Sequence, residues 1–173
     1  GFGPALGLPD PSPFVLKTMA WMQLAGIEYT LLGDVNNLRR APRGKLPWID
    51  DDGTVVADSA RIIEHLVRRH GADPDAWLDP AQQARAWLYA RALEEEFYWC
   101  LVYSRWIDEQ TWSRLRGRLF ASLPPPLRVI VPPIARRSVR IALHGQGLGR
   151  RPRQEILERT GRTADALATL LGD

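Results

Sequence analysis

The 173-residue sequence has no apolar run long enough to cross a membrane, which takes about 20 residues, and no signal-peptide pattern at its start. Cys100 is the sole cysteine, which excludes an internal disulfide framework and a Cys-x-x-Cys redox pair. The three histidines and this cysteine are scattered along the chain, so no metal site is predicted. These features favour a globular protein of a reducing, cytoplasmic compartment.

Acidic residues are missing from Arg114 to Arg153, a stretch that holds ten arginines. Residues 1–80 hold 8 Lys/Arg against 11 Asp/Glu, a net charge of −3, whereas residues 81–173 hold 15 against 9, a net charge of +6. The arginines could form a surface for an anionic partner, such as a membrane. Solvated helix faces explain them more simply, and no nucleic-acid motif accompanies them, so neither nucleic-acid binding nor membrane association is favoured.

The first 72 residues have the pattern of a small α/β domain. Ser12 can cap a helix whose first turn begins at Pro13, and Gly26 ends that helix. Residues 28–32 then alternate as a strand. Residues 33–44 are polar and predict a loop or a short irregular helix.

A strand, a tight turn, a second strand and a helix follow between residues 45 and 66. Asp52-Gly53 supplies the positive-φ turn of a hairpin. Ser59 occupies the predicted cap of the next helix, in which apolar residues recur at helical spacing. Pro47 is unusual at the start of a strand because it cannot donate a hydrogen bond to a ladder. This corner is therefore a candidate small-molecule site.

Residues 73–79 form a linker by composition, and residues 80–173 read as helices. A long helix is predicted through residues 88–106, with Glu94 to Glu96 largely towards solvent, and Cys100 is interpreted as buried packing. The prolines at 124–126 and 132–133 are expected to interrupt the helices that follow, and the glycines at 145–149 to mark a break. Four tryptophans are expected to pack in the core because of their helical spacing: Trp87, Trp99, Trp106 and Trp112.

Several motifs in this order are similar to those of the glutathione S-transferase superfamily. They are Ser-Pro-Phe at residues 12–14, Lys-Leu-Pro-Trp at 45–48, Asp-Ser at 58–59, Glu-Glu-Phe-Tyr-Trp at 95–99 and His-Gly-Gln-Gly-Leu-Gly-Arg at 144–150. Within the superfamily, the chain most resembles the failed axon connections and metaxin-like branch. The resemblance implies a thioredoxin-like α/β domain over residues 1–72 and an incomplete all-α glutathione-transferase-type domain over residues 80–173. It also implies a fragment, lacking most of a first strand and the last helices, of a protein that is commonly a homodimer.

Ser12 is the candidate catalytic residue. Glutathione chemistry needs a thiolate, but a free thiol has a pKa of about 8.5 and is mostly protonated at neutral pH. A hydroxyl donor at a helix N-terminus favours the anion, and the resemblance assigns this role to Ser12. Helix capping alone, worth about 1 kcal/mol, explains the same serine equally well.

The predicted glutathione-binding residues are Lys45, Leu46, Pro47, Asp58 and Ser59. The resemblance implies a cis bond before Pro47, with the main chain of Leu46 pairing with glutathione like an added strand. The helix that begins near Ser59 would bind the γ-glutamyl carboxylate, and Asp58 would pair with the amino group of the ligand. Lys45 could bind the glycyl carboxylate or remain a solvated surface charge.

The sequence therefore leaves two functions open. The first is a glutathione transferase that activates glutathione, its co-substrate, for attack on a small electrophile or for peroxide reduction, without a metal. The second is a non-catalytic metaxin-like binding or scaffold module that uses the basic helical surface. A thioredoxin-type redox role is disfavoured because Cys-x-x-Cys is missing.

Overall fold

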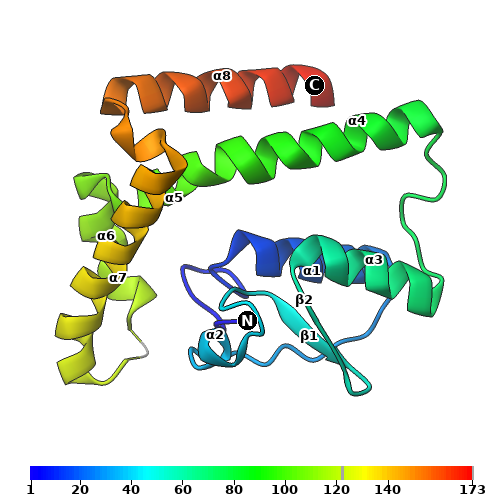
Figure 1. The fold of residues 1–173 in the computed structure, drawn as a ribbon, viewed down its shortest axis with the longest axis horizontal. Helices are drawn as coiled ribbons and strands as arrows, with labels where there is room; N and C mark the ends of the chain where they lie inside the picture. Colours follow the sequence, from blue (N-terminus) through cyan, green and yellow to red (C-terminus); the bar gives the residue numbers. More distant parts are fainter. Residues whose placement is uncertain (122, 173) are drawn as a thin grey trace. The chain divides into compact units, whose positions relative to one another are not determined.

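The computed structural model describes residues 1–121 and 123–172 and divides into two compact units, residues 1–77 and 78–173 (Figure 1). The predicted linker, residues 73–79, spans this division. The first unit contains helices α1 (Pro13–Leu24), α2 (Asn37–Arg40) and α3 (Ser59–His70), and strands β1 (Trp48–Asp51) and β2 (Thr54–Ala57). Its core joins Met22 of α1 to Ile62 and Leu66 of α3, with Ile49 and Val56 of the hairpin packed against them.

The hairpin has the predicted turn. β1 and β2 pair antiparallel, with Trp48 opposite Ala57 and Asp51 opposite Thr54. Asp52 and Gly53 have φ values of 51° and 84°. Two successive positive φ values define the type I′ turn, whose twist matches that of the flanking strands. The register is therefore fixed by two residues that the sequence identifies.

The strand expected at residues 28–32 is not formed. One pair of hydrogen bonds, from Gly1 N to Leu32 O (3.1 Å) and from Asp34 N to Gly1 O (3.2 Å), makes a single rung of parallel pairing. One rung does not continue into a ladder, and the described segment 27–34 has no other strand partner. Alternation of side chains predicts a strand only where a neighbouring chain segment supplies the hydrogen bonds.

The second unit is helical, as predicted. It contains α4 (Pro80–Arg91), the π-helix η1 (Ala92–Phe97), α5 (Tyr98–Trp106), α6 (Glu109–Leu119), α7 (Pro125–Gln146), the 3₁₀ turn η2 (Leu148–Arg150) and α8 (Arg153–Leu171). Its core combines Cys100 of α5 with Leu143, Leu148 and Ile156, all at most 5% exposed. Cys100 is thus buried packing, as predicted.

Three expectations for this unit are wrong. The first concerns the glutamates that were expected to face solvent. The long helix changes to π geometry at residues 92–97, which shifts the helical register. Glu94 and Glu96 are half-buried as a result, and they pair with Arg91 and Arg159 respectively. Trp87 is 62% exposed rather than in the core, whereas Trp112 is buried and stacks on Trp106.

The third wrong expectation concerns the prolines of α7. Pro132 and Pro133 lie inside the helix and do not end it. Each lacks an N–H for the helical ladder, at a cost of about 3 kcal/mol in a helix interior. Burial of Pro132 and Leu143 in the second unit offsets that cost. Helix propensity is a local property and does not include this packing, so the sequence pattern predicted a break.

Candidate functional site

Ser12 caps α1 and retains a proton to donate. Its Oγ accepts a hydrogen bond from Val15 N at 3.4 Å, and Pro13 occupies the first helical position. The residue is half-buried, and within the described parts of the chain no acceptor is recorded for its hydroxyl proton. A hydroxyl can donate one hydrogen bond while it accepts others, so capping and interaction with a thiolate are compatible. The two explanations of Ser12 therefore do not compete.

Asp10 positions Ser12, and the sequence pattern did not identify it. Its side chain is fully buried, and one carboxylate oxygen accepts from Ser12 N at 2.9 Å. The other accepts from Phe2 N at 2.5 Å and Gly3 N at 3.1 Å. A carboxylate two residues before a serine cap is an Asx-type signal in the sequence. Asp10 thus ties the N-terminal segment to the start of α1.

Asp58, not Ser59, caps α3. The Asp58 carboxylate accepts from Ala60 N at 3.0 Å and Arg61 N at 3.3 Å, and Ser59 is the first helical residue. Asp58 has φ of 87°, which places its short side chain over the helix end. Either residue could act as a cap by type, and only the backbone conformation decides between them. The capping role expected of Ser59 is therefore corrected, and its hydroxyl is not used on the helix.

Lys17 brings a positive charge to this helix end. Its Nζ lies 3.5 Å from Ser59 Oγ, and Ser59 is only 5% exposed. The contact joins the second turn of α1 to the first turn of α3. An ammonium, a hydroxyl and a helix N-terminus all favour an anion. The sequence gives Lys17 no such role, because the residue is remote from Ser59 along the chain.

The Leu46–Pro47 bond is cis, as the resemblance implies. Pro47 O accepts a hydrogen bond from Asp58 N at 3.3 Å, so the start of the hairpin adjoins the cap of α3. In the described residues, no group hydrogen-bonds the main-chain N–H or C=O of Leu46, which is half-buried. Lys45 is exposed and makes no ion pair with the described residues. Leu46 thus has main-chain groups available to a ligand.

One contact joins two predicted residues, Asp58 N with Pro47 O, and a second joins the predicted Ser59 to Lys17, a residue that the sequence analysis did not include. One open hollow of this unit is lined by Gln23 and residues 26–30, at the opposite end of α1 from Ser12. It contains none of the predicted site residues. The candidate site is therefore a surface made by two helix N-termini and one loop.

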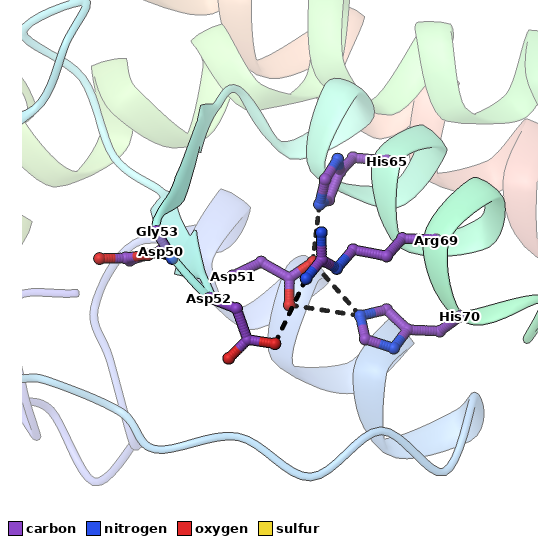
Figure 2. Close-up of polar contacts among 7 residues, drawn as sticks. All are labelled: Asp50, Asp51, Asp52, Gly53, His65, Arg69 and His70. Atoms are coloured by element: carbon purple, nitrogen blue, oxygen red, sulfur yellow. Dashed lines mark hydrogen bonds and ion pairs between the residues drawn. The ribbon is translucent and has the colours of Figure 1, made fainter.

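A second polar cluster lies at the other end of α3 (Figure 2). The Asp51 carboxylate, at the end of β1, contacts three basic side chains of α3. Its Oδ2 lies 2.7 Å from His65 Nε2, 3.1 Å from Arg69 Nε and 3.3 Å from His70 Nε2. The hydrogen bond from His65, with smaller contributions from His70 and Arg69, holds the pKa of Asp51 below its usual value. Basic side chains in the last turn also suit the negative end of the helix dipole. This cluster anchors α3 to the hairpin.

No group of three or more metal-binding side chains that could hold an ion is found among the described residues. In the same part of the chain, no helix has both the length and the apolar character needed to cross a bilayer.

Comparison with known proteins assigns the family. Residues 13–111 match the family model of the glutathione S-transferase N-terminal domain. The chain is 36% identical over its whole length to the isoprene-epoxide–glutathione S-transferase of Rhodococcus sp. (strain AD45), of which it covers 75%. The chain belongs to the glutathione S-transferase family.

Other relatives place the chain near a particular branch. Failed axon connections of Drosophila melanogaster is 33% identical over 57% of the chain and 23% of that protein. Metaxin-2 of Mus musculus is 24% identical over 91% of the chain and 60% of that protein. No solved structure gave a significant match. The family and the metaxin-like similarity agree with the motifs of the sequence.

Proposed function

We propose that this protein binds glutathione and lowers the pKa of its thiol, so that the thiolate attacks a small electrophile. The Rhodococcus relative is named for an epoxide of isoprene. For an epoxide, the glutathione sulfur forms a bond to a ring carbon and the C–O bond breaks. The oxygen leaves as an alkoxide and takes up a proton. The same thiolate would also suit peroxide reduction.

The observation that carries this proposal is the state of Ser12. Its oxygen accepts a hydrogen bond from the Val15 amide at the N-terminus of a 12-residue helix, and its hydroxyl can donate a second hydrogen bond to a ligand. A donor of this kind stabilises the thiolate, because a hydrogen bond to sulfur becomes stronger as negative charge collects there. Asp10 holds the Ser12 amide and thereby fixes the cap. Ser12 is the proposed catalytic residue and Asp10 a positioning residue.

The proposed binding groups belong to the loop before β1 and to the N-terminus of α3. The main chain of Leu46 would pair with the cysteinyl part of glutathione, because its N–H and C=O have no partner among the described residues. Ser59 and the N-terminus of α3 would receive the γ-glutamyl carboxylate, with Lys17 adding charge. Asp58 uses one carboxylate oxygen on its helix, which leaves the other for the ligand's amino group. Lys45, exposed beside Leu46, would meet the glycyl carboxylate.

The test separates binding from activation. Glutathione binding is measured by calorimetry, and the pKa of the bound thiol is obtained from thiolate absorbance against pH. Ser12→Asp keeps a capping acceptor but cannot donate and adds negative charge, so it should retain the fold and raise the thiol pKa. Ser12→Thr keeps both roles and should leave the thiol pKa near that of the parent.

Turnover with an epoxide completes the experiment. Loss of one positioned donor typically lowers kcat by about 10²-fold or more. We expect such a loss in Ser12→Asp but not in Ser12→Thr. Binding with an unchanged thiol pKa in Ser12→Asp would reject Ser12 as the donor. No binding at millimolar glutathione would reject the transferase and favour the non-catalytic metaxin-like module.

A further inference from the structure

A cluster of positive charge precedes the proposed binding residue Leu46. Residues 39–45, the basic segment, join the end of α2 to the loop before β1 (Figure 1). The first unit, residues 1–77, holds 8 Lys and Arg against 10 Asp and Glu, and half of these cations lie in the basic segment. They are Arg39, Arg40, Arg43 and Lys45. A unit with a net negative charge thus carries a positive patch beside one of its proposed binding groups.

The four cations have no counter-charge in the described residues. All four are exposed, and their side chains make no ion pair or hydrogen bond in that part of the chain. No Asp or Glu lies between Asp34 and Asp50, and each of these two carboxylates accepts from an N–H of its own turn. Asp34 accepts from Asn36 N at 2.8 Å, and Asp50 accepts from Gly53 N at 2.7 Å. The charge of the basic segment is therefore available to a ligand.

The direction of the chain places this segment at one end of the proposed ligand. The cysteinyl part of glutathione is proposed to pair with Leu46, and the γ-glutamyl end to bind the N-terminus of α3. Pro47 O accepts from Asp58 N at 3.3 Å, so the residue after Leu46 adjoins that helix end. A ligand that pairs like a strand and has its γ-glutamyl end beside Pro47 runs antiparallel to the protein chain. Its C-terminal residue therefore continues towards Lys45 and Arg43.

The basic segment carries more charge than glutathione requires. Glutathione has one negative group after its cysteinyl residue, the glycyl carboxylate, for which Lys45 is the proposed partner. Three guanidinium groups remain, and each can bind a carboxylate through two parallel hydrogen bonds. The segment also has room for a larger residue, because Arg43 and Gly44 are exposed and a Cβ built on Gly44 meets nothing within 4 Å. A longer, more negative C-terminal residue thus fits this end of the site.

We propose that the basic segment makes the site selective for thiol peptides that carry a second negative charge on their C-terminal residue, such as γ-Glu-Cys-Glu. Lys45 binds the terminal carboxylate of such a peptide, and Arg40 and Arg43 bind its side-chain carboxylate. The inference rests on the proposed function, because it concerns the same site. It extends the co-substrate from glutathione to a class of anionic γ-glutamylcysteinyl peptides.

The test compares two peptides that differ in charge but hardly in shape. Calorimetry on the full chain measures the Kd of γ-Glu-Cys-Glu and of γ-Glu-Cys-Gln, with glutathione as the reference thiol. An exposed ion pair contributes up to about fivefold in affinity, so γ-Glu-Cys-Glu should bind about three- to fivefold more tightly than γ-Glu-Cys-Gln at low salt. The ratio of the two Kd values should approach one as salt rises to about 0.5 M, because the Debye length shortens.

The R40A/R43A double variant tests the assignment to the basic segment. It keeps Lys45 and the main chain of Leu46, so its affinity for glutathione should stay within about twofold of the parent, whereas the two peptides should bind equally. The R68A/R162A double variant is the matched control, because it removes two exposed arginines from outside the segment. It should keep the preference of the parent, and circular dichroism should show equal helix content in both variants.

The outcomes separate this inference from the proposed function. Binding of glutathione together with equal affinities for the two peptides would overturn the inference and leave the proposed function standing. A preference that persists in R40A/R43A, or that is lost equally in R68A/R162A, would also overturn it. Absence of binding by all three thiols would overturn the proposed function and the inference together.

Discussion

His65 Nε2 lies 2.7 Å from Asp51 Oδ2, a contact that joins the end of β1 to the C-terminal half of α3. His70 and Arg69 approach the same carboxylate from the last turn of the helix (Figure 2). The opposite end of α3 carries Asp58 and Ser59 of the candidate site. The cluster at Asp51 therefore holds the helix whose first turn is proposed to bind glutathione.

Replacing Asp51 by Asn should reduce stability in a pH-dependent way. The pKa of Asp51 is lowered from 3.8 in the native state, mainly by its hydrogen bond to His65, so the stabilisation is present above that value and is lost as pH falls through the lower native pKa. Urea unfolding of the parent and of D51N is compared from about pH 5 to about pH 2.5, the range in which the Asp51 carboxylate takes up its proton. The difference in unfolding free energy should shrink towards the acid end. D52N, whose side chain is 86% exposed, should differ from the parent by less than about 0.5 kcal/mol throughout.

Asp58→Ala and Ser59→Ala should separate capping from ligand binding. D58A removes the acceptor of the Ala60 and Arg61 amides and should lower the free energy of unfolding by about 1 kcal/mol. S59A leaves the cap intact but removes the hydroxyl that Lys17 contacts, so it should change glutathione affinity more than stability. Thermal unfolding and calorimetry check the pair. A larger loss of stability in S59A than in D58A would contradict this assignment of the cap.

Gly33→Ala should destabilise the first unit. A Cβ at Gly33 would lie 2.6 Å from the Cα of Gly3, a main-chain atom that cannot move aside cheaply. Overpacking of this kind typically costs about 1–3 kcal/mol. Gly161→Ala in α8 is the control, since a Cβ there meets nothing within 4 Å and the change should stabilise the helix by about 0.5–1 kcal/mol. Chemical denaturation followed by circular dichroism measures both, and a neutral G33A would argue against the close approach of Gly3 and Gly33.

Asp10→Asn should destabilise the first unit and disturb the Ser12 amide. The fully buried carboxylate accepts hydrogen bonds from three main-chain amides, and an asparagine presents an NH₂ group to some of them. A buried donor left without a partner costs about 1–3 kcal/mol. The exposed Asp73, which accepts from Asp75 N at 3.0 Å, provides the control D73N. Equal stability of D10N and D73N in urea would show that the three amides do not depend on the carboxylate.

Local signals in the sequence predicted much of the fold. Ser12 with Pro13 starts α1, and Asp52-Gly53 forms the I′ turn, because each signal acts through the backbone of its immediate neighbours. The failures occurred where the outcome depends on a distant partner. Residues 28–32 lack a ladder, and α7 runs through Pro132 because packing outweighs propensity.

The candidate site likewise has features that local sequence signals predicted and others that depend on distant partners. The sequence by itself determined the family, through motifs at Ser12, Lys45-Leu46-Pro47 and Asp58-Ser59, and its single cysteine excludes a Cys-x-x-Cys pair within it. Only the tertiary structure decided that Asp58 is the cap, that Lys17 reaches Ser59 and that Asp10 holds the Ser12 amide. Residue types fix which hydrogen bonds are chemically possible, whereas packing α1 against α3 selects which of them are made.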